Sequence, residues 1–406
     1  MNILFLTLVD INSITDRGIY TDLLRHFVQK GHDVTIVCPK ERRKGIDTNL
    51  QSNKNHRILQ VKTFNIVSTN IVEKGIGTLA IEYQYLAAIR KYLPDIWFDL
   101  IMYSTPPITF TRVIKAIKKR DNARTYLLLK DIFPQNAVDL GMMKRDGILH
   151  RFFRRKEKQL YKVSDYIGCM SPANVNYVLK HNPEISPDRV EVCPNSIEPV
   201  KEAAGKNDML RSQYNIPAEA TLYIYGGNLG KPQGLDFLTE VLETNNNKPD
   251  RFFIVIGSGT EKQKLTDWFQ SHQLSNAVML DGLPKEAYDR LVRSCDVGLI
   301  FLDRRFTIPN YPSRLLSYLE NKMPVLVASD TNTDVGSIAE ENGYGLWAEH
   351  GDIEKFNKLL NVFCENPELR KQMGQKGYRY LMENYTVERS YEVIMLSTNY
   401  TNSLIV

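Results

Sequence analysis

A glycine-rich segment in the second half of the chain contains residue types that bind phosphate. It reads YIYGGNLGKPQG (223–234) and lies between a predicted strand and a predicted helix. Glycine lets the backbone approach a ligand closely, and the free N–H groups at a helix N-terminus attract a diphosphate. We therefore expect Gly227, Asn228 and Lys231 to contact a phosphorylated ligand, with Lys231 adding positive charge. An ordinary glycine-rich turn fits equally well, since the segment lacks the G-x-G-x-x-G pattern of dinucleotide-binding dehydrogenases.

A second segment, DRRFTIPNYPSR (303–314), follows a predicted strand at 297–301 and leads into a predicted helix. Loops at the carboxyl ends of parallel strands are where such sheets bind ligands. Ser313 is expected to cap the helix, which puts Arg314 in the first turn. The helix dipole disfavours a cation there, and a bound diphosphate would remove that conflict. A solvated arginine without a role is the alternative.

In the first half, KDIFPQN (130–136) follows a predicted strand at 124–129 and places Lys130 and Asp131 at the same kind of edge. Asp131 is a candidate to bind a sugar hydroxyl or to position an acceptor. An Asx-turn that caps the loop is equally compatible with the spacing. Gly18 ends the first predicted strand–helix loop, where it permits close approach of a phosphate or a sugar.

Basic residues are concentrated between 112 and 162, where 15 Lys and Arg stand against 5 Asp and Glu, although the whole chain carries a formal charge of only +5. This surplus implies an anionic partner at one place. Within it, LHRFFRRKEKQLY (149–161) has apolar residues at helical spacing among cations, which is typical of a helix on an anionic membrane surface. A helix packed on the core with a solvated basic face is the alternative. Nucleic-acid binding is disfavoured, because the chain has no recognition motif and no stacking platform of aromatic residues.

These loops need elements that position them, and the hydrophobic pattern supplies alternating strands and helices. Short apolar runs predict strands at 2–9, 33–38, 100–103, 124–129, 166–169 and 190–193, and again at 221–225, 251–256, 278–280, 297–301 and 325–328. Between them, helical spacing predicts helices such as 18–30, 235–242, 261–273, 285–294 and 313–321, and the chain reads as helical from about 366 to 397. The polar stretch 194–215 reads as a linker. Two successive Rossmann-like α/β domains follow, and the cleft between them is the expected ligand site.

The bulk composition agrees with a globular two-domain protein of 406 residues. No apolar run reaches the ~18–20 residues that cross a bilayer, and MNILFLTLVDINS reads as a first strand rather than a signal peptide. The five cysteines lie far apart without a CxxC pair, which favours a reducing cytoplasm and argues against a zinc site. The seven His are scattered and no Asp-x-Asp is present, so no metal or other cofactor is expected. No nucleophile elbow is found.

Six segments in order resemble the family 4 glycosyltransferases, in particular the WbuB-like group of capsule and O-antigen biosynthesis. The resemblance covers nearly the whole chain. It is carried by KDIFPQNAVDLG (130–141), SPANVNYVL with VEVCPNSIEP (171–199), GGNLGKPQGLDFL (226–238), VIGSGTEKQKL (255–265), LDGLPKEAYDRLVRSCDVGLIFL (280–302) and PSRLLSYLENKMPVLVA (312–328).

The resemblance implies a GT-B fold, in which two Rossmann-like domains have parallel sheets facing a central cleft. It implies an acceptor-binding domain at 1–198, onto which a last helix at about 386–406 packs back, and a nucleotide-sugar domain at 199–385. It also implies retention of configuration without a metal. By position it places Gly282 and Leu283 near the base, Arg314 and Lys231 near the diphosphate, and Gly18 behind the phosphates. The loop residues expected around the donor sugar are Thr307, Asn310, Tyr311, Pro312 and Ser313.

The chain departs from the family pattern at three places. Ser317 stands where the family usually has a glutamate that binds the ribose, and Glu320 lies one helical turn later as a possible substitute. Asn228 and Gln233 occupy positions that are commonly Arg and Lys. Lys130 occupies the position of a catalytic histidine in many relatives.

The resemblance implies transfer of a sugar, such as the N-acetylated deoxyhexosamine FucNAc, from a UDP-sugar to a polyprenyl-diphosphate-linked saccharide. The enzyme is expected in the cytoplasm, peripheral at the inner face of the membrane through 149–161. One alternative is a GT-B UDP-sugar epimerase, for which the motifs supply few acid–base groups. Another alternative is a catalytically degenerate partner subunit, because Ser317 replaces the glutamate that usually binds the ribose.

Overall fold

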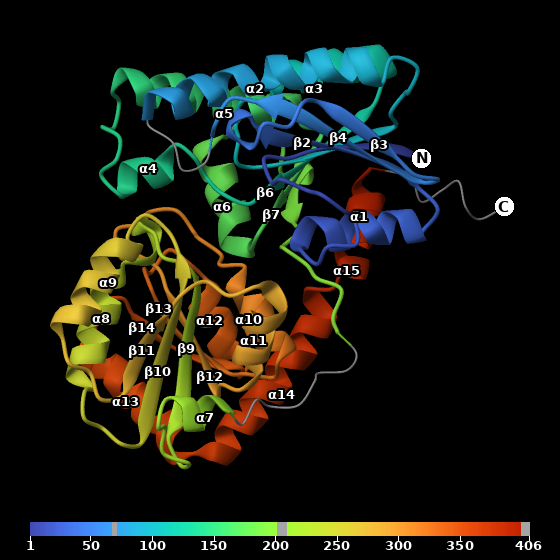
Figure 1. Cartoon of the computed structure of the whole chain (residues 1–406). Coiled ribbons are helices and arrows are strands. Elements are labelled where there is room, and N and C mark those ends of the chain that lie inside the picture. The colour runs from blue at the N-terminus through green and yellow to red at the C-terminus, as the bar shows by residue number, and fades with distance from the viewer. Residues whose placement is uncertain (67–70, 201–208, 399–406) are drawn as a thin grey trace. The chain divides into compact units, whose positions relative to one another are not determined.

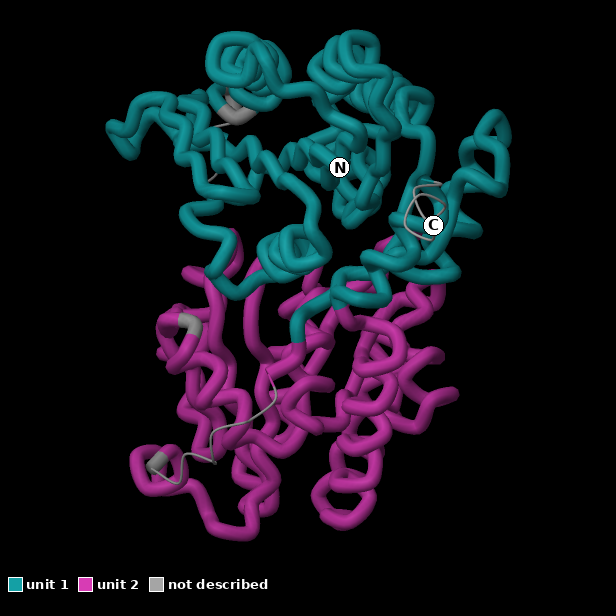
Figure 2. The backbone as a smooth tube through the Cα atoms, turned by 90° about the vertical axis from the view of Figure 1, so that its right-hand side faces the viewer, with its two compact units in different colours: residues 1–198, 387–406 teal, residues 199–386 magenta. Residues whose placement is uncertain are grey.

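The computed structural model describes residues 1–66, 71–200 and 209–398. The chain divides into two compact units (Figure 2). Unit 1 comprises Met1–Glu198 with Val387–Val406, and unit 2 comprises Pro199–Thr386. Each unit is an α/β domain built on a predominantly parallel sheet.

Unit 1 contains an eight-stranded sheet in the order β3-β4-β2-β1-β5-β6-β7-β8. Every pair is parallel except β3 with β4. The strands are β1 Asn2–Leu6, β2 Asp33–Glu41, β3 Asn49–Ser52, β4 His56–Thr63, β5 Leu100–Ser104, β6 Arg124–Leu129, β7 Tyr166–Cys169 and β8 Val190–Val192. β1 is shorter than the predicted strand at 2–9, and β3 and β4 were not predicted.

The helices of unit 1 cover both faces of this sheet (Figure 1). They are α1 Ile19–Gln29, α2 Ile71–Tyr92, α3 Thr111–Asp121, α4 Gln135–Asp139, α5 Ile148–Val163, α6 Pro172–His181 and α15 Val387–Ser397, with short 3-10 turns η1 Arg42–Lys44 and η2 Pro187–Arg189. α1 buries Leu23, Leu24 and Phe27 against the sheet. The last helix, α15, packs on α1, where the rings of Tyr391 and Phe27 lie 4.9 Å apart.

Unit 2 contains an all-parallel sheet of six strands in the order β11-β10-β9-β12-β13-β14. Its strands are β9 Thr221–Asn228, β10 Arg251–Ser258, β11 Ala277–Leu280, β12 Val297–Phe301, β13 Val325–Ser329 and β14 Gly345–Glu349. Its helices are α7 Met209–Gln213, α8 Leu235–Thr244, α9 Lys262–Ser271, α10 Lys285–Arg293, α11 Arg314–Glu320, α12 Val335–Glu341, α13 Ile353–Glu365 and α14 Pro367–Asn384, with the 3-10 turn η3 Lys231–Gln233. Of the predicted linker 194–215, residues 201–208 lie outside the described residues, and 209–213 form α7 rather than an extended segment.

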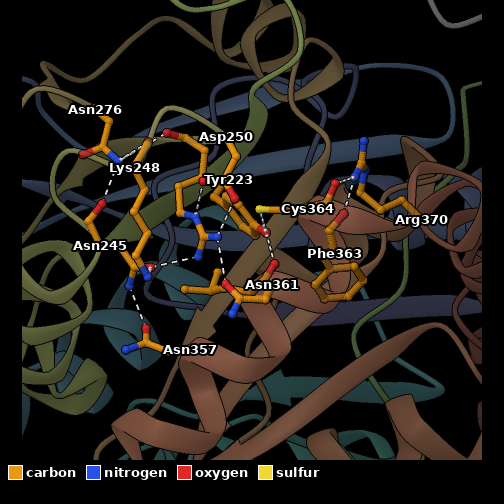
Figure 3. A network of polar contacts seen from close by, with 12 residues as sticks. Tyr223, Asn245, Lys248, Asp250, Asn276, Asn357, Asn361, Phe363, Cys364 and Arg370 are labelled. Atoms are coloured by element: carbon orange, nitrogen blue, oxygen red, sulfur yellow. Dashed lines mark hydrogen bonds and ion pairs between the residues drawn. The ribbon is translucent and has the colours of Figure 1, made fainter.

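A buried polar network closes the amino-terminal edge of the unit 2 sheet (Figure 3). The side chain of Arg251, the first residue of β10, is 3% exposed. Its guanidinium donates to Asn245 Oδ1 at 2.9 Å, to Asn361 Oδ1 at 2.8 Å and to the carboxylate of Asp250 at 2.8 and 2.6 Å. Because Asn245 follows α8 and Asn361 lies on α13, one cation joins two helices to the sheet. This edge is opposite to the carboxyl ends where the predicted site residues lie.

We expect Arg251→Met to lower the free energy of unfolding of unit 2 by about 3 kcal/mol, because the buried Asn245 amide oxygen and the half-buried Asn361 amide oxygen lose a charged donor. Urea unfolding followed by circular dichroism measures the effect. Lys264→Met is the control, since its ammonium pairs with Asp236 at an exposed site, and it should leave the unfolding midpoint unchanged. Equal midpoints for Arg251→Met and the control would contradict a structural role for this network.

Candidate active site

Close backbone packing shapes the carboxyl end of β9. A Cβ on Gly226 would lie 2.2 Å from the Tyr288 hydroxyl oxygen, and a Cβ on Gly257 of β10 would lie 1.8 Å from the Gly227 carbonyl oxygen. Gly227 itself has a φ of +118°, which residues with a side chain rarely adopt. Packing therefore requires glycine at 226 and 257, and the backbone conformation favours glycine at 227. Position 227 also lies beside a charged side chain of another element.

That charged group is Arg314, the first residue of α11. Its guanidinium carbon lies 4.4 Å from the ring centroid of Tyr225, and a Cβ on Gly227 would lie 3.7 Å from it. Nη2 donates to Gln233 Oε1 at 2.8 Å and to the Asn228 carbonyl oxygen at 3.4 Å. Nη1 is buried and has no hydrogen-bond partner among the described residues. The structure therefore brings Gly227, Asn228 and Arg314 together, and it leaves one N–H group of the cation unsatisfied.

Ser313 and Lys231 are the other two residues that the sequence placed around the diphosphate and the start of α11. Ser313 occupies the position before α11, but its φ and ψ of −63° and −21° are helical, and its side chain makes no capping hydrogen bond. The predicted N-cap position and the place of Arg314 in the first turn are confirmed, but the expected side-chain cap is not formed, because a capping side chain needs an extended backbone to reach the N–H groups of the first turn. Lys231 is exposed and begins η3, which places its ammonium in solvent.

The 303–312 loop is held both by contacts within it and by contacts with other segments of unit 2. Asp303 is buried and accepts from the Arg305 backbone N–H at 2.9 Å and from its guanidinium at 2.8 and 2.6 Å, so the two charges neutralise each other. Thr307 is exposed, and Asn310 is anchored by its backbone N–H, which donates to Thr333 Oγ1 at 3.0 Å. Of the predicted loop residues, Thr307 and Ser313 are thus the exposed ones.

Tyr311 and Pro312, which were expected around the donor sugar, are less exposed than Thr307. Tyr311 is 7% exposed, and its hydroxyl pairs with that of Tyr385. Burial raises the pKa of Tyr311 well above its ordinary value. Pro312 is half-buried. The structure therefore directs the Tyr311 hydroxyl into the interior of unit 2 rather than toward Arg314.

The residues expected near the base and ribose are spread over two elements. Gly282 and Leu283 are exposed and follow β11, which lies two strands from β9 at the edge of the sheet. Ser317 is half-buried on α11. One turn later, Glu320 Oε1 accepts from the backbone N–H of Val200 at 2.9 Å, so this carboxylate also holds the chain that enters unit 2.

In unit 1, Lys130 and Asp131 follow β6 and have diverging side chains. Thr105 Oγ1 accepts from both of their backbone N–H groups, at 2.9 and 3.1 Å, which fixes the turn. The Asp131 carboxylate accepts from Asn136 Nδ2 at 2.8 Å on each oxygen. Lys130 Nζ instead donates to the Cys193 carbonyl oxygen at 3.2 Å. Burial raises the pKa of Asp131 to about 6 and lowers that of Lys130 to about 8.

Gly18 precedes α1, and its N–H donates to Asp22 Oδ1 at 3.1 Å. Its φ of 176° is extended backbone that any residue adopts, so its glycine is not required by the backbone conformation. Because β1 and β6 flank β5, Gly18 and Asp131 follow strands of the same sheet at the same edge.

Three site residues were not identified from the sequence: Thr105, Asn136 and Tyr225. Asn136 lies inside a segment that was identified, and Gln233 was named there only as a departure from the family pattern, because the partner of neither side chain follows from the sequence. Tyr225 reads as an ordinary strand residue. Thr105 carries no local signal, because its role depends on contacts with residues 25 and 26 positions later. Among the described residues, no three His, Cys, Asp or Glu side chains gather into a metal-binding group.

Comparison with known proteins now defines the class. A model described as Glycosyltransferase Family 4 matches residues 19–201, and one described as Glycosyl transferases group 1 matches residues 206–380. The chain is therefore a glycosyltransferase, with two Rossmann-like parallel-sheet domains of the GT-B type. It joins a family 4 domain to a group 1 domain.

Curated relatives agree at low identity. The probable glycosyltransferase WbjE of Pseudomonas aeruginosa is 21% identical over 294 residues, which is 71% of each chain. The putative colanic acid biosynthesis glycosyl transferase WcaI of Escherichia coli (strain K12) is 23% identical over 274 residues, or 65% of each chain. These names favour a transferase and give no support to an epimerase.

Solved structures show the same fold. Sucrose-phosphate synthase from Thermosynechococcus elongatus superposes with a TM-score of 0.76 at 12% identity, covering 99% of both chains. Anabaena Alr3699/HepE in complex with UDP superposes with a TM-score of 0.68 at 13% identity, covering 98% of this chain and 99% of that one. At such identities the likeness establishes the fold alone.

Asp131 should make unit 1 less stable as pH rises. Its folded pKa of about 6 lies above the ordinary value of 3.8, so the native state binds the proton more tightly, and this contribution is lost as pH rises from about 4 through 6. We expect Asp131→Asn to raise the melting temperature relative to the unmodified protein by more at pH 7.5 than at pH 4.5. Thermal unfolding at both pH values measures this, with the exposed Asp146→Asn as the control. A difference that does not change with pH would contradict the burial of this carboxylate.

Proposed function

We propose that the chain is a retaining glycosyltransferase that moves a sugar from a UDP-sugar to a polyprenyl-diphosphate-linked saccharide in capsule or O-antigen synthesis. The observation that carries the donor half is the unsatisfied Nη1 of Arg314 beside Gly227, at the carboxyl end of a parallel strand. A diphosphate is a ligand that meets such a cation with both charge and hydrogen-bond acceptors. A UDP complex of a protein with this fold and a colanic acid enzyme among the curated relatives also support the proposal.

In this proposal the donor's anomeric C–O bond breaks with its electron pair leaving on UDP. Arg314 and Lys231 stabilise the developing charge on the diphosphate, and no metal is needed. The acceptor hydroxyl oxygen bonds to the anomeric carbon from the same face, and its proton passes to the departing phosphate. Preorganised charge of this kind is usually the largest catalytic contribution.

The acceptor half is assigned to Lys130 and Asp131 in unit 1. Asp131 would accept a hydrogen bond from a sugar hydroxyl, with Asn136 fixing the carboxylate. Lys130 would act by fixing the turn through Cys193. Gly18 would lie behind the donor phosphates, Gly282 and Leu283 near the base, and Ser317 or Glu320 near the ribose. Thr307, Asn310 and Ser313 would line the sugar, proposed to be an N-acetylated deoxyhexosamine such as FucNAc.

A lipid-linked acceptor requires that the enzyme reach a membrane, and three helices of unit 1 offer a surface for it. On α5 and just before it, Met142, Ile148, Leu149 and Phe152 are 63, 89, 63 and 40% exposed. α3 packs against both α5 and α2 (Figure 1), and α2 adds Ile76, Leu79 and Tyr83, which are 53, 40 and 52% exposed. The stripe on α2 was not foreseen from the sequence.

Cations surround these apolar side chains. The Arg112 guanidinium of α3 lies 4.4 Å from the Tyr83 ring centroid, and Lys156 of α5 lies 3.6 Å from the Glu82 carboxylate of α2. We propose that this face lies on an anionic membrane, which places the enzyme at the cytoplasmic side as a peripheral protein. None of the helices within the described residues is long and apolar enough to span a bilayer.

Arg314→Gln should weaken UDP binding about ten- to a hundredfold, since a charged hydrogen-bond donor is lost. It should also reduce acceptor-dependent UDP release by about 10²–10³-fold. Calorimetry with UDP, without added metal, and a coupled UDP-release assay measure the two effects. Arg293→Gln, a half-buried arginine on α10 that contacts Asn321, is the matched control. Full activity in Arg314→Gln would refute the assignment.

The double variant Ile148→Ser/Leu149→Ser should bind vesicles of phosphatidylglycerol at least tenfold more weakly than the unmodified protein, because each apolar side chain contributes about 1.5 kcal/mol or more on burial. Co-sedimentation at low salt measures this, and raising the salt should weaken the remaining binding. Leu396→Ser, which removes a 60% exposed leucine of α15, is the control. An unmodified protein that ignores anionic vesicles would remove the membrane proposal.

A further inference from the structure

A buried carboxylate on α1 has no part in the proposed chemistry, yet both of its oxygens are engaged. The Asp22 side chain is 0% exposed. Its Oδ1 accepts from the Gly18 backbone N–H at 3.1 Å and from Arg25 Nη2 at 2.7 Å. Its Oδ2 accepts from the backbone N–H of Glu198 at 3.1 Å, 176 residues later in the chain. A carboxylate that only stabilised the first turn of α1 would not need this distant partner.

Arg25 extends the same junction. Its Nη1 donates to the Ile14 carbonyl oxygen at 2.7 Å, and its Nε and Nη2 donate to Glu198 Oε2 at 3.1 and 3.0 Å. The loop between β1 and α1 is therefore held at Ile14 and at Gly18. Glu198 is held through both its main chain and its side chain. The ion pair of the buried Asp22 with the half-buried Arg25 therefore contacts both segments.

Glu198 is the last residue of unit 1 before the chain passes into unit 2. The chain returns at Val387, whose N–H donates to the Ile197 carbonyl oxygen at 3.1 Å. The next residue, Glu388, contacts α1 again, with its carboxylate 3.0 Å from His26 Nε2 and 2.9 Å from Lys30 Nζ. Thus the first turn of α1 contacts the chain as it leaves unit 1, and the last turn of α1 contacts the chain as it returns.

We propose that Asp22 is a positioning residue that couples the Gly18 loop to the point where the chain leaves unit 1. Both N–H groups donate to one buried carboxylate, so a shift of Glu198 either carries the Gly18 loop with it or breaks a hydrogen bond to Asp22. The two segments therefore move as one body. The catalytic consequence rests on the proposed function, in which Gly18 lies behind the donor phosphates, because misplacement of about 1 Å costs rate out of proportion to binding.

Asp22→Asn tests the coupling, since an amide offers one acceptor where the carboxylate offers two. We expect amide hydrogen exchange at Gly18 and at Glu198 to accelerate together, by about tenfold. We also expect kcat for sugar transfer to fall at least tenfold while the Kd for UDP stays within twofold. Asp121→Asn is the matched control: its side chain is also 0% exposed and accepts from a backbone N–H, that of Phe98 at 3.0 Å, and from Arg120, but at the amino-terminal edge of the sheet.

Glu198→Gln provides a second variant that should fold in any case, because its side chain is 47% exposed. It weakens the hold of Arg25 and should give the same pattern with a smaller amplitude. Acceleration at only one of the two segments, or an unchanged kcat in Asp22→Asn, would overturn the proposal. An unmodified protein that binds no UDP and releases none from UDP-sugars would refute the proposed function instead. The exchange pattern would then still decide whether the two segments are coupled.

Discussion

Steric exclusion at the carboxyl end of β9 determines much of the candidate donor site. The backbones of β9 and β10 approach so closely that a Cβ on Gly257 would nearly touch the Gly227 carbonyl oxygen, and a Cβ on Gly226 would collide with Tyr288. Because side chains are excluded there, the surface beside Gly227 stays open. The Arg314 guanidinium occupies part of that opening, where it rests on the Tyr225 ring. A residue with a side chain at 227 would be strained by the φ of +118°, and its Cβ would lie in van der Waals contact with the Arg314 guanidinium.

The cation in that opening is stabilised by weak partners. Tyr225 contributes its ring face and Gln233 a neutral oxygen, and among the described residues no carboxylate pairs with Arg314. A carboxylate partner would have neutralised the charge, as Asp303 does for Arg305. The contrast between two arginines of the same segment supports a role for Arg314 toward an external anion. Asn228 and Gln233 stand where the family commonly has basic residues, and both accept hydrogen bonds from Arg314. The positive charge at this place is therefore supplied by α11.

The alternation of strands and helices could be predicted from the sequence, whereas the side-chain contacts that form the candidate site could not. The runs at 124–129, 166–169 and 297–301 coincide with β6, β7 and β12, because strands buried on both faces leave continuous apolar segments. The strand β3 was missed because it lies at the sheet edge, is half exposed and lacks such a run. β4 was missed because buried polar residues such as Gln60 and Thr63 interrupt its apolar pattern. The direction of Tyr311 depends on Tyr385, and that of Arg314 on Gln233, 74 and 81 residues away along the chain. Ser313 occupies the predicted N-cap position, but its side chain does not cap, because capping depends on backbone angles that residue type alone does not fix.

The buried charged groups of the two units differ in their surroundings. In unit 2, one buried N–H group of the Arg314 guanidinium has no partner among the described residues, which suits an anionic ligand. In unit 1, burial raises the pKa of Asp131 to about 6 and lowers that of Lys130 to about 8, and the two side chains have neutral partners, Asn136 and the Cys193 carbonyl. The Asp131 carboxylate, fixed by Asn136, suits an uncharged hydroxyl that donates a hydrogen bond better than a phosphate, whose charge it would repel. This division supports a donor diphosphate on the second unit and a sugar hydroxyl on the first, and it explains why the same fold edge carries different residues in each.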